Sequence, residues 1–163
     1  MEAYRAIVSK RDTRRFAERP VPEDVLERIL QAGRMAGSSK NTQPVRLVVL
    51  RDPERLAALA ACGQFAEHVP HCAVAIAVVL IDDGGAFDAG RAAQNMMVAG
   101  WAEGVTSCPT TMHDGDCART TLGAPEGSEV AIVLAMGYPE EGSRLGAGRE
   151  RVAMDDLVHW ERW

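Results

Sequence analysis

Residues 9–16 read SKRDTRRF, and four of them are cationic in a chain whose formal net charge is -5. A second polar stretch, SSKNTQP at residues 38–44, follows one predicted helix later. Arginine presents planar, forked donors that suit phosphate and other anions. A bare run of basic residues is more often a solvated turn. The second stretch at this separation instead favours a binding site for an anionic ligand.

The length of 163 residues suits a single domain, residues 1–163, with one sizeable core. A pI near 5.4 argues against a nucleic-acid binder, because such domains usually carry a basic excess on one face. The N-terminus lacks the apolar core of a signal peptide. The longest apolar run, residues 73–81, is too short to cross a bilayer. We therefore expect a cytoplasmic protein without a membrane or nucleic-acid partner.

The four cysteines show no Cys-x-x-Cys spacing, which disfavours a structural zinc site or a thioredoxin-type motif. The sequence His68-x-x-His71-Cys72 is not followed by a second cluster of metal-ligating residues, so no metal site is expected. In a reducing compartment the default is a free, buried thiol. The sequence therefore predicts four free cysteines.

Apolar periodicity and turn residues predict an irregular alternation of helices and strands, typical of an α+β fold with helices packed on one sheet. The expected helices cover residues 2–10, 22 to the stop at Gly37, 52–62, 88–103 and 116–122. The expected strands cover residues 46–50, 73–81, 105–108 and 129–137, and residues 109–112 are expected to be a loop. Residues 73–81 are nearly all apolar, which indicates a central strand covered on both faces.

Together, the two polar stretches resemble the two signature segments of the nitroreductase family of FMN-binding flavoenzymes. The first is similar to Arg-Arg-Ser-x-Arg-x-Phe, and the second to Pro-Ser-x-x-Asn-x-Gln-Pro. A Leu-Gly-x-Pro-Glu turn at residues 122–126, Gly-Tyr-Pro at 137–139 and Arg-x-Arg at 149–151 follow in the family's order. The resemblance implies a central mixed, mostly antiparallel sheet flanked by helices, in a homodimer. FMN would lie at the subunit interface, and the C-terminal tail would extend over the partner subunit.

The resemblance also implies roles for the basic stretch. Lys10, Arg11 and Asp12 would surround the phosphate and ribityl chain of FMN. Arg14 would face the N1/C2 carbonyl edge of the flavin and stabilise its reduced form, a preorganised electrostatic role. An ordinary surface arginine in an ion pair is the alternative reading of Arg14.

Two further segments match flavin-contacting segments of the family. Ser39 and Asn41 would contact the flavin, Ser39 from the second subunit; Asn41 could also be a turn residue that tolerates left-handed backbone. Pro109, Thr110 and Thr111 match the loop beside the dimethylbenzene ring and N5, where a backbone N–H commonly donates to N5. An ordinary loop is the alternative there.

Arg149 and Arg151 match the cations that close on the FMN phosphate, with a solvated tail as the alternative. No side chain is required as a general acid or base, because the flavin carries the chemistry. His113 is the only histidine that the sequence places near the flavin loop, and no role is assigned to it.

The chain departs from the family pattern at two places. Asp12 stands where most members have serine, and a carboxylate beside a phosphate is repulsive unless flanking arginines hold it. Val45 replaces a frequent tryptophan, and residues 82–87 form a short connection. The helical insertion that shapes the acceptor pocket in larger members is therefore expected to be missing, which predicts an open acceptor site.

The predicted function is an FMN-dependent oxidoreductase that takes hydride from NADH or NADPH at flavin N5. It would then reduce a small acceptor such as a nitroaromatic or a quinone by a ping-pong scheme. One alternative is a non-catalytic flavin-binding or storage protein. Another is an enzyme that fragments reduced FMN to make the lower ligand of cobalamin. Residues 40–42 read Lys-Asn-Thr where a Gly-Phe pair is expected in that branch.

Overall fold

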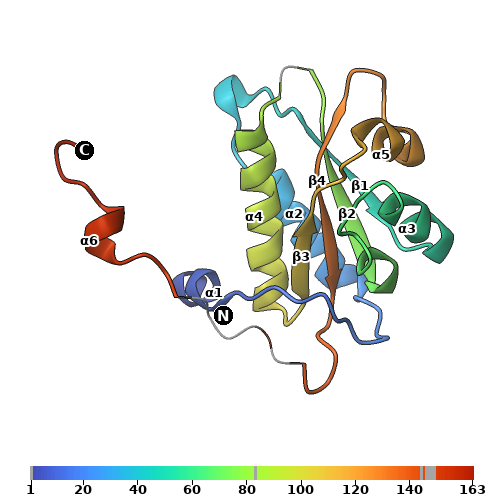
Figure 1. The fold of residues 1–163 in the computed structure, drawn as a ribbon, viewed down its shortest axis with the longest axis horizontal. Coiled ribbons are helices and arrows are strands. Elements are labelled where there is room, and N and C mark those ends of the chain that lie inside the picture. The colour runs from blue at the N-terminus through green and yellow to red at the C-terminus, as the bar shows by residue number, and fades with distance from the viewer. Residues whose placement is uncertain (1, 83, 144, 146–149) are drawn as a thin grey trace.

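The computed structural model describes residues 2–82, 84–143, 145 and 150–163. Its centre is a four-stranded sheet in the order β1-β2-β4-β3. The strands are β1 (Val45–Leu50), β2 (Val74–Leu80), β3 (Thr106–Thr110) and β4 (Glu129–Gly137). All three ladders between them are antiparallel, and a single parallel bridge joins Asp12 to Ser107. The expected α+β fold is confirmed (Figure 1).

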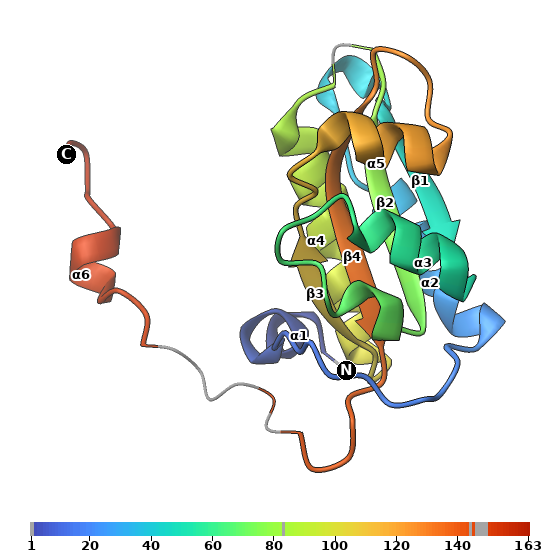
Figure 2. The ribbon, with the colours of Figure 1, turned by 45° about the vertical axis from the view of Figure 1, so that its right-hand side comes forward.

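Helices cover both faces of this sheet. The described helices are α1 (Ala3–Ser9), α2 (Glu23–Arg34), α3 (Pro53–Ala60), α4 (Ala86–Ala102), α5 (Gly115–Leu122) and α6 (Met154–Leu157), with 3-10 turns η1 (Ser39–Asn41) and η2 (Val69–His71). Helices α2 and α4 lie on one face, and α3 and α5 on the other (Figure 2). None of the described helices is long and apolar enough to span a membrane.

The central strand β2 is buried along its whole length, as its apolar sequence predicts. Ala75, Ala77 and Val79 join the core beneath α3 and α5, whereas Ile76 and Val78 join the core beneath α2 and α4. Successive side chains of a strand point to opposite faces. A strand covered on both faces must therefore be apolar at every position, not at alternate ones.

Close packing of α4 depends on a missing side chain. A Cβ placed on Gly100 would lie 2.7 Å from Met136 Cε in β4 and 3.3 Å from the Val105 carbonyl oxygen. The helix therefore approaches the sheet more closely than an alanine would allow.

Helix α2 and strand β3 have other boundaries than the sequence predicts. Helix α2 ends at Arg34, three residues before Gly37, and Pro22 is its N-cap rather than its first residue. Pro109 and Thr110 are not loop residues but the last two residues of β3. Proline lacks the N–H that a central strand needs, but it is tolerated at a sheet edge, which is where β3 lies.

The prediction of four free cysteines is also wrong. Cys62, just after α3, forms a disulfide with Cys117 in α5, whereas Cys72 and Cys108 are free and buried. This disulfide cannot be inferred from the sequence, because the two cysteines are 55 positions apart. They meet because α3 and α5 lie side by side on one face of the sheet (Figure 2).

Removing this cross-link should destabilise the protein. A disulfide closing a loop of this length restricts the unfolded chain, and its loss typically costs about 2–4 kcal/mol. We expect the double variant Cys62→Ser/Cys117→Ser to lose that much free energy of unfolding in urea without reductant. Reductant should lower the stability of the parent and leave the variant unchanged. Four titratable thiols in the unfolded, unreduced parent would contradict the bond.

Candidate functional site

The basic stretch is held by its main chain against the ends of two strands. The Thr13 N–H donates to the Ser107 carbonyl at 3.1 Å, and the Ala17 N–H donates to the Tyr138 carbonyl at 2.9 Å. Bridges pair Asp12 with Ser107 in β3 and Phe16 with residue 139 beyond β4. Residues 12–17 therefore pass from the edge strand β3 to the end of β4, and these main-chain bonds fix the position from which their side chains project.

Within this stretch, Lys10 and Arg11 already have protein partners. The Lys10 ammonium pairs with the Asp12 carboxylate and lies 3.4 Å from Met97 Sδ in α4. The Arg11 guanidinium donates to the Val8 carbonyl at 3.2 Å and the Lys10 carbonyl at 2.8 Å, at the end of α1. Asp12 is thus held by a lysine, not by the flanking arginines that the sequence suggested, and it offsets part of the local positive charge.

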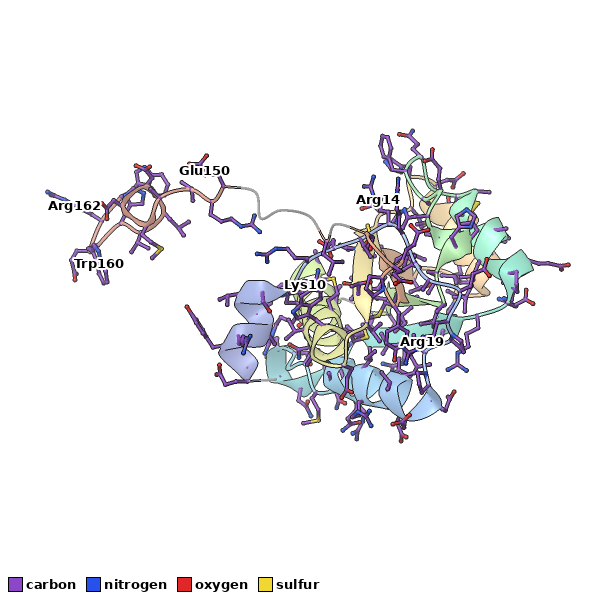
Figure 3. The ribbon with its side chains drawn as sticks, turned by 90° about the horizontal axis from the view of Figure 1, so that it is seen from below. Lys10, Arg14, Arg19, Glu150, Trp160 and Arg162 are labelled. Carbon is purple, nitrogen blue, oxygen red and sulfur yellow. A yellow bond between two sulfur atoms is a disulfide. The ribbon has the colours of Figure 1, made fainter. Side chains whose placement is uncertain are left out.

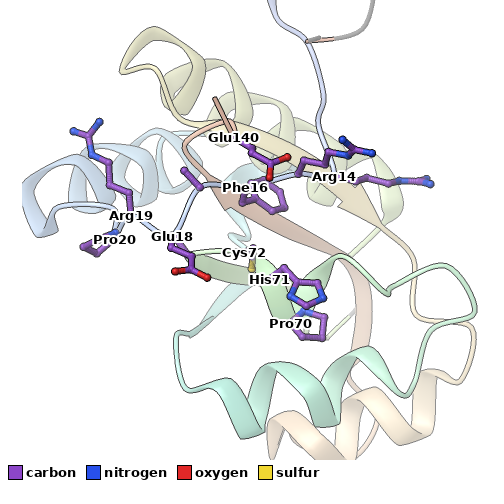
Figure 4. Close-up of a pocket in the computed structure, with 12 residues that line it drawn as sticks. Arg14, Phe16, Glu18, Arg19, Pro20, Pro70, His71, Cys72 and Glu140 are labelled. Carbon is purple, nitrogen blue, oxygen red and sulfur yellow. The ribbon is translucent and has the colours of Figure 1, made fainter. Parts of the chain in front are cut away.

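Arg14 differs from these residues. Its side chain is exposed and forms no hydrogen bond or ion pair with any other residue that the structure describes. It borders a cavity of about 650 Å³ with Phe16, His71 and Glu140, between residues 14–20 and the start of β2 (Figure 4). An unpaired guanidinium at the rim of a cavity is available to an anionic ligand.

Beside Arg14, β3 supplies polar groups that are buried. The Thr110 hydroxyl lies 2.8 Å from His68 Nε2, and both residues are buried. The Ser107 hydroxyl oxygen is buried and has no hydrogen-bond partner among the described residues. Buried polar groups usually have a hydrogen-bond partner, so an unpartnered hydroxyl in the core is unusual. Thr111, directly after β3, is exposed.

His68 is the functional candidate that the sequence did not identify. His113, the histidine expected near this loop, accepts from the Gln64 N–H at 3.1 Å through Nδ1 and does not contact β3 through any described bond. No sequence signal could reveal His68, because its contact with Thr110 exists only after β3 has paired with β4. The free thiol of Cys72, also in the cavity wall, is neutral because burial raises its pKa to about 11.

The second polar stretch is not brought to this site. Ser39 and Asn41 are exposed in η1, before β1, whereas Asp12 lies beside the opposite end of the sheet. The seven residues of β2 separate the two ends by about 20 Å. Asn41 has a φ of 57°, so the reading as a residue tolerating left-handed backbone describes its conformation.

The C-terminal residues are likewise remote from the basic stretch. Arg149 lies outside the described residues, and Arg151 is exposed in the segment that leads to α6. Figure 3 shows Glu150, Trp160 and Arg162 on an arm well away from Lys10 and Arg14. One copy of the chain therefore joins Lys10, Arg11, Asp12, Arg14, Pro109, Thr110 and Thr111 along one sheet edge, but not Ser39, Asn41 or Arg151.

Comparison with known proteins places this geometry in a family. The nitroreductase family model matches residues 7–79 and 80–138, which is most of the chain. The chain belongs to the nitroreductase family. An Archaeoglobus fulgidus protein described as an NADH dehydrogenase/NAD(P)H nitroreductase is 28% identical over 174 residues, covering 99% of both chains. A Thermus thermophilus NADH dehydrogenase is 29% identical over 202 residues, covering 98% of this chain and 96% of the relative.

Solved nitroreductase structures share the fold over the whole chain. A Desulfovibrio desulfuricans nitroreductase in complex with FMN has a TM-score of 0.87 at 25% identity, covering 100% of this chain and 98% of that one. The Vibrio harveyi NADPH:FMN oxidoreductase complexed with NAD+ has a TM-score of 0.90 at 23% identity, covering 99% of this chain and 77% of that one. The family resemblance read from the sequence is confirmed.

The buried histidine His68 should make the stability of the protein depend on pH. Burial lowers the pKa of His68 below its ordinary 6.5, Arg14 lowers it further, and Glu67 acts in the opposite direction. Below pH 6.5 His68 binds a proton in the unfolded chain but not yet in the folded protein, where its pKa is lower. The stabilising contribution is therefore complete above pH 6.5 and is lost as pH falls toward the folded-state pKa.

Urea unfolding between pH 8 and pH 5 measures this effect. The parent should lose stability below pH 6.5 more steeply than His68→Gln, whose amide does not titrate. The matched control is His71→Gln, an exposed histidine three residues away, which should keep the parent's profile. Identical pH profiles for the parent and His68→Gln would show that His68 titrates normally in the folded protein.

Proposed function

We propose that this chain is an FMN-dependent oxidoreductase that takes hydride from NADH or NADPH and passes it to a small acceptor. A nitroaromatic or a quinone reduced by a ping-pong scheme is the acceptor chemistry that we favour. The observation that carries the proposal is the unpaired Arg14 beside the buried polar groups of β3, in a chain of the nitroreductase family. The whole activity is assigned to one domain, residues 1–163.

The residues along the sheet edge fit a flavin mononucleotide. Arg14 offers a free guanidinium to a ring edge that becomes negative on reduction. Pro109 and Thr111 expose the end of β3 on which a flat ring could rest. When bound, the flavin supplies the hydride chemistry, and these residues supply orientation and charge. Reported complexes of relatives with FMN and NAD+ support this assignment.

The phosphate end is assigned to Lys10, Arg11 and Asp12. Lys10 now pairs with Asp12, with the lysine side chain 11% and the aspartate side chain 51% exposed, and a bound phosphate would compete with Asp12 for the same ammonium. Asp12 would then accept hydrogen bonds from the ribityl hydroxyls. A carboxylate is favourable beside these neutral donors, whereas the charged phosphate would repel it. Arg149 and Arg151 are assigned to the same phosphate from the other subunit, because the arm that carries Arg151 is remote from the basic stretch within one chain.

We further propose that the site is completed by a second copy of the chain. Ser39 and Asn41 lie at the other end of the sheet from Asp12, about 20 Å away along the strands, so a partner must supply them if they contact the same flavin. The C-terminal arm is rich in apolar side chains that the rest of its chain does not cover, with Trp160 81% and Trp163 99% exposed. Such large apolar areas are costly in water and suit a partner surface.

Incubation of the purified protein with FMN tests the cofactor assignment. The protein should retain flavin absorbance after desalting, prefer FMN to FAD, and bleach when NADH or NADPH is added. Continued NAD(P)H oxidation with an added quinone would separate an enzyme from a flavin store. A protein that shows no flavin absorbance after incubation with excess FMN would refute the proposed function.

The variant Arg14→Ala tests whether Arg14 lies at the N1/C2 edge of the flavin. Losing a hydrogen bond to a charged group costs about 1.5–3 kcal/mol, so FMN should bind roughly 10- to 150-fold more weakly. The midpoint potential of the remaining bound flavin should also become more negative. Arg51→Ala is the matched control, because Arg51 is exposed and pairs with Glu23 away from the basic stretch. Equal potentials for the parent and Arg14→Ala would remove Arg14 from the ring edge.

Deletion of residues 158–163 tests the role of the C-terminal arm. Both the dimer and FMN retention should weaken, because the proposal puts them at one interface. Sedimentation and the ratio of flavin to protein absorbance measure the two effects. Phe65 is exposed and lies outside the arm. The variant Phe65→Ser therefore controls for a general effect of removing exposed apolar surface. An unchanged truncated dimer at full FMN occupancy would show that the arm does not bridge the subunits.

A further inference from the structure

The cavity bordered by Arg14 continues past the flavin edge that is assigned to this arginine. Along the chain, the residues assigned to the phosphate come first, bridged to β3 at Asp12, and Arg14 follows. Residues 14–20 then form one wall of the cavity, and Pro70 and His71 of η2 lie opposite (Figure 4). Its volume of about 650 Å³ is in the range of small-molecule sites. A ligand that stacks on the assigned ring position has room to extend into this space.

Two further arginines line this cavity, and neither has an acidic partner. Arg15 and Arg19 are both exposed, and within the described part of the chain no carboxylate pairs with them. The arginines that do form ion pairs, Arg28, Arg51 and Arg119, do not line the cavity. A guanidinium without a carboxylate partner is suited to forked hydrogen bonds with a phosphate. The cavity therefore offers two cations beyond the one assigned to the flavin.

The side chain of Arg19 is held in position by an aromatic ring. Its guanidinium carbon lies 3.8 Å from the centroid of the Tyr138 ring, a cation–π contact. The Arg19 N–H donates to the Ala17 carbonyl at 2.7 Å, and the Ala17 N–H donates to the Tyr138 carbonyl at 2.9 Å. The ring thus fixes the guanidinium without using its N–H donors. A cation that is already positioned loses less conformational freedom when it binds an anion.

Apolar surface separates the cations of the cavity. Figure 4 shows Arg14 and Arg19 toward opposite ends, with Phe16 between them. The apolar residues of the lining are Phe16, Ala17, Pro20, Pro70 and Ala73. Two acids, Glu18 and Glu140, also line the cavity, so its three arginines outnumber its carboxylates in a chain of net charge -5. This combination suits a ligand that carries both phosphate groups and a flat ring.

We propose that this cavity binds the diphosphate and adenosine end of the dinucleotide reductant, with Arg15 and Arg19 as its phosphate-binding residues. This inference rests on the proposed function, because the assigned flavin position fixes where the nicotinamide ring must lie. The dinucleotide carries its negative charge on phosphates and a flat adenine beyond them, which matches cations beside an apolar wall. A neutral quinone or nitroaromatic has no phosphate for these arginines. Arg15 and Arg19 therefore act on the reductant and not on the acceptor.

Calorimetry with ADP-ribose, which is the dinucleotide without its nicotinamide ring, tests the site directly. The protein is first loaded with FMN, so that the flavin phosphate site is already filled. Arg15→Gln and Arg19→Gln should each bind ADP-ribose about 10-fold more weakly, because a charged hydrogen bond is lost. Arg51→Gln, outside the cavity, should bind like the parent. Glu140→Gln removes a negative charge from the same wall and should bind more tightly, an effect that a folding defect cannot produce.

Rapid mixing of the FMN-loaded protein with NADH or NADPH tests the same residues in the reaction. Arg15→Gln and Arg19→Gln should raise the dinucleotide concentration that gives half-maximal flavin bleaching by about 10-fold. The limiting rate and the flavin midpoint potential should stay at the parent's values, because neither residue is assigned to the ring. Reoxidation of the reduced protein by a neutral quinone should also be unchanged.

Two results would overturn the inference. One is ADP-ribose binding with the parent's affinity in both Arg15→Gln and Arg19→Gln. The other is a loss in quinone reoxidation as large as the loss in dinucleotide binding, which would assign the cavity to the acceptor. A protein that binds no FMN refutes the proposed function instead. Binding of ADP-ribose to that flavin-free protein, weakened by Arg15→Gln, would still support an adenosine phosphate site in the cavity.

Discussion

The main-chain hydrogen bonds that attach residues 12–17 to the ends of β3 and β4 are the constraint on which the site depends. Thr13 and Ala17 donate to strand-end carbonyls, and bridges at Asp12 and Phe16 continue the contact. The segment is thereby fixed in register with β3. That register brings Lys10 to Met97 and leaves Arg14 free near His68. A basic stretch held only by side chains would have no defined position relative to the ring that we assign to it.

The same constraint explains why one copy of the chain holds only part of the predicted site. The sheet edge collects the basic stretch and the end of β3. Strand β1 pairs antiparallel with β2, so the polar loop that precedes β1 lies at the other end of β2. Helix α4 touches the loop region through Arg91, near Gly37, and the basic stretch through Met97. The separation is therefore built into the core and cannot be closed by a loop movement.

The sequence is most informative where the pattern within one segment is enough to determine its structure. The continuous apolar run predicts β2, and small and sulfur-containing residues at helical spacing predict α4. The sequence does not predict features that depend on contact with a segment far away in the chain. The Cys62–Cys117 bond needs α3 beside α5, the buried His68 needs β3 paired with β4, and Pro109 is allowed in β3 only because that strand is an edge. The sequence identified the basic stretch as a candidate site, but it did not predict that Lys10 would pair with Asp12.

The central claim is that one flavin is held by Arg14 of one subunit and by Asn41 of the other. A mixed dimer of Arg14→Ala and Asn41→Ala chains, carrying two different affinity tags and purified through both, tests it most directly. Each variant alone should bind FMN weakly at both sites. If the site is shared between subunits, the mixed dimer contains one site with both residues intact, and titration should find one FMN per dimer with the parent's affinity. A mixed dimer that recovers no tight site would contradict the account, because both residues would then belong to the same chain's site.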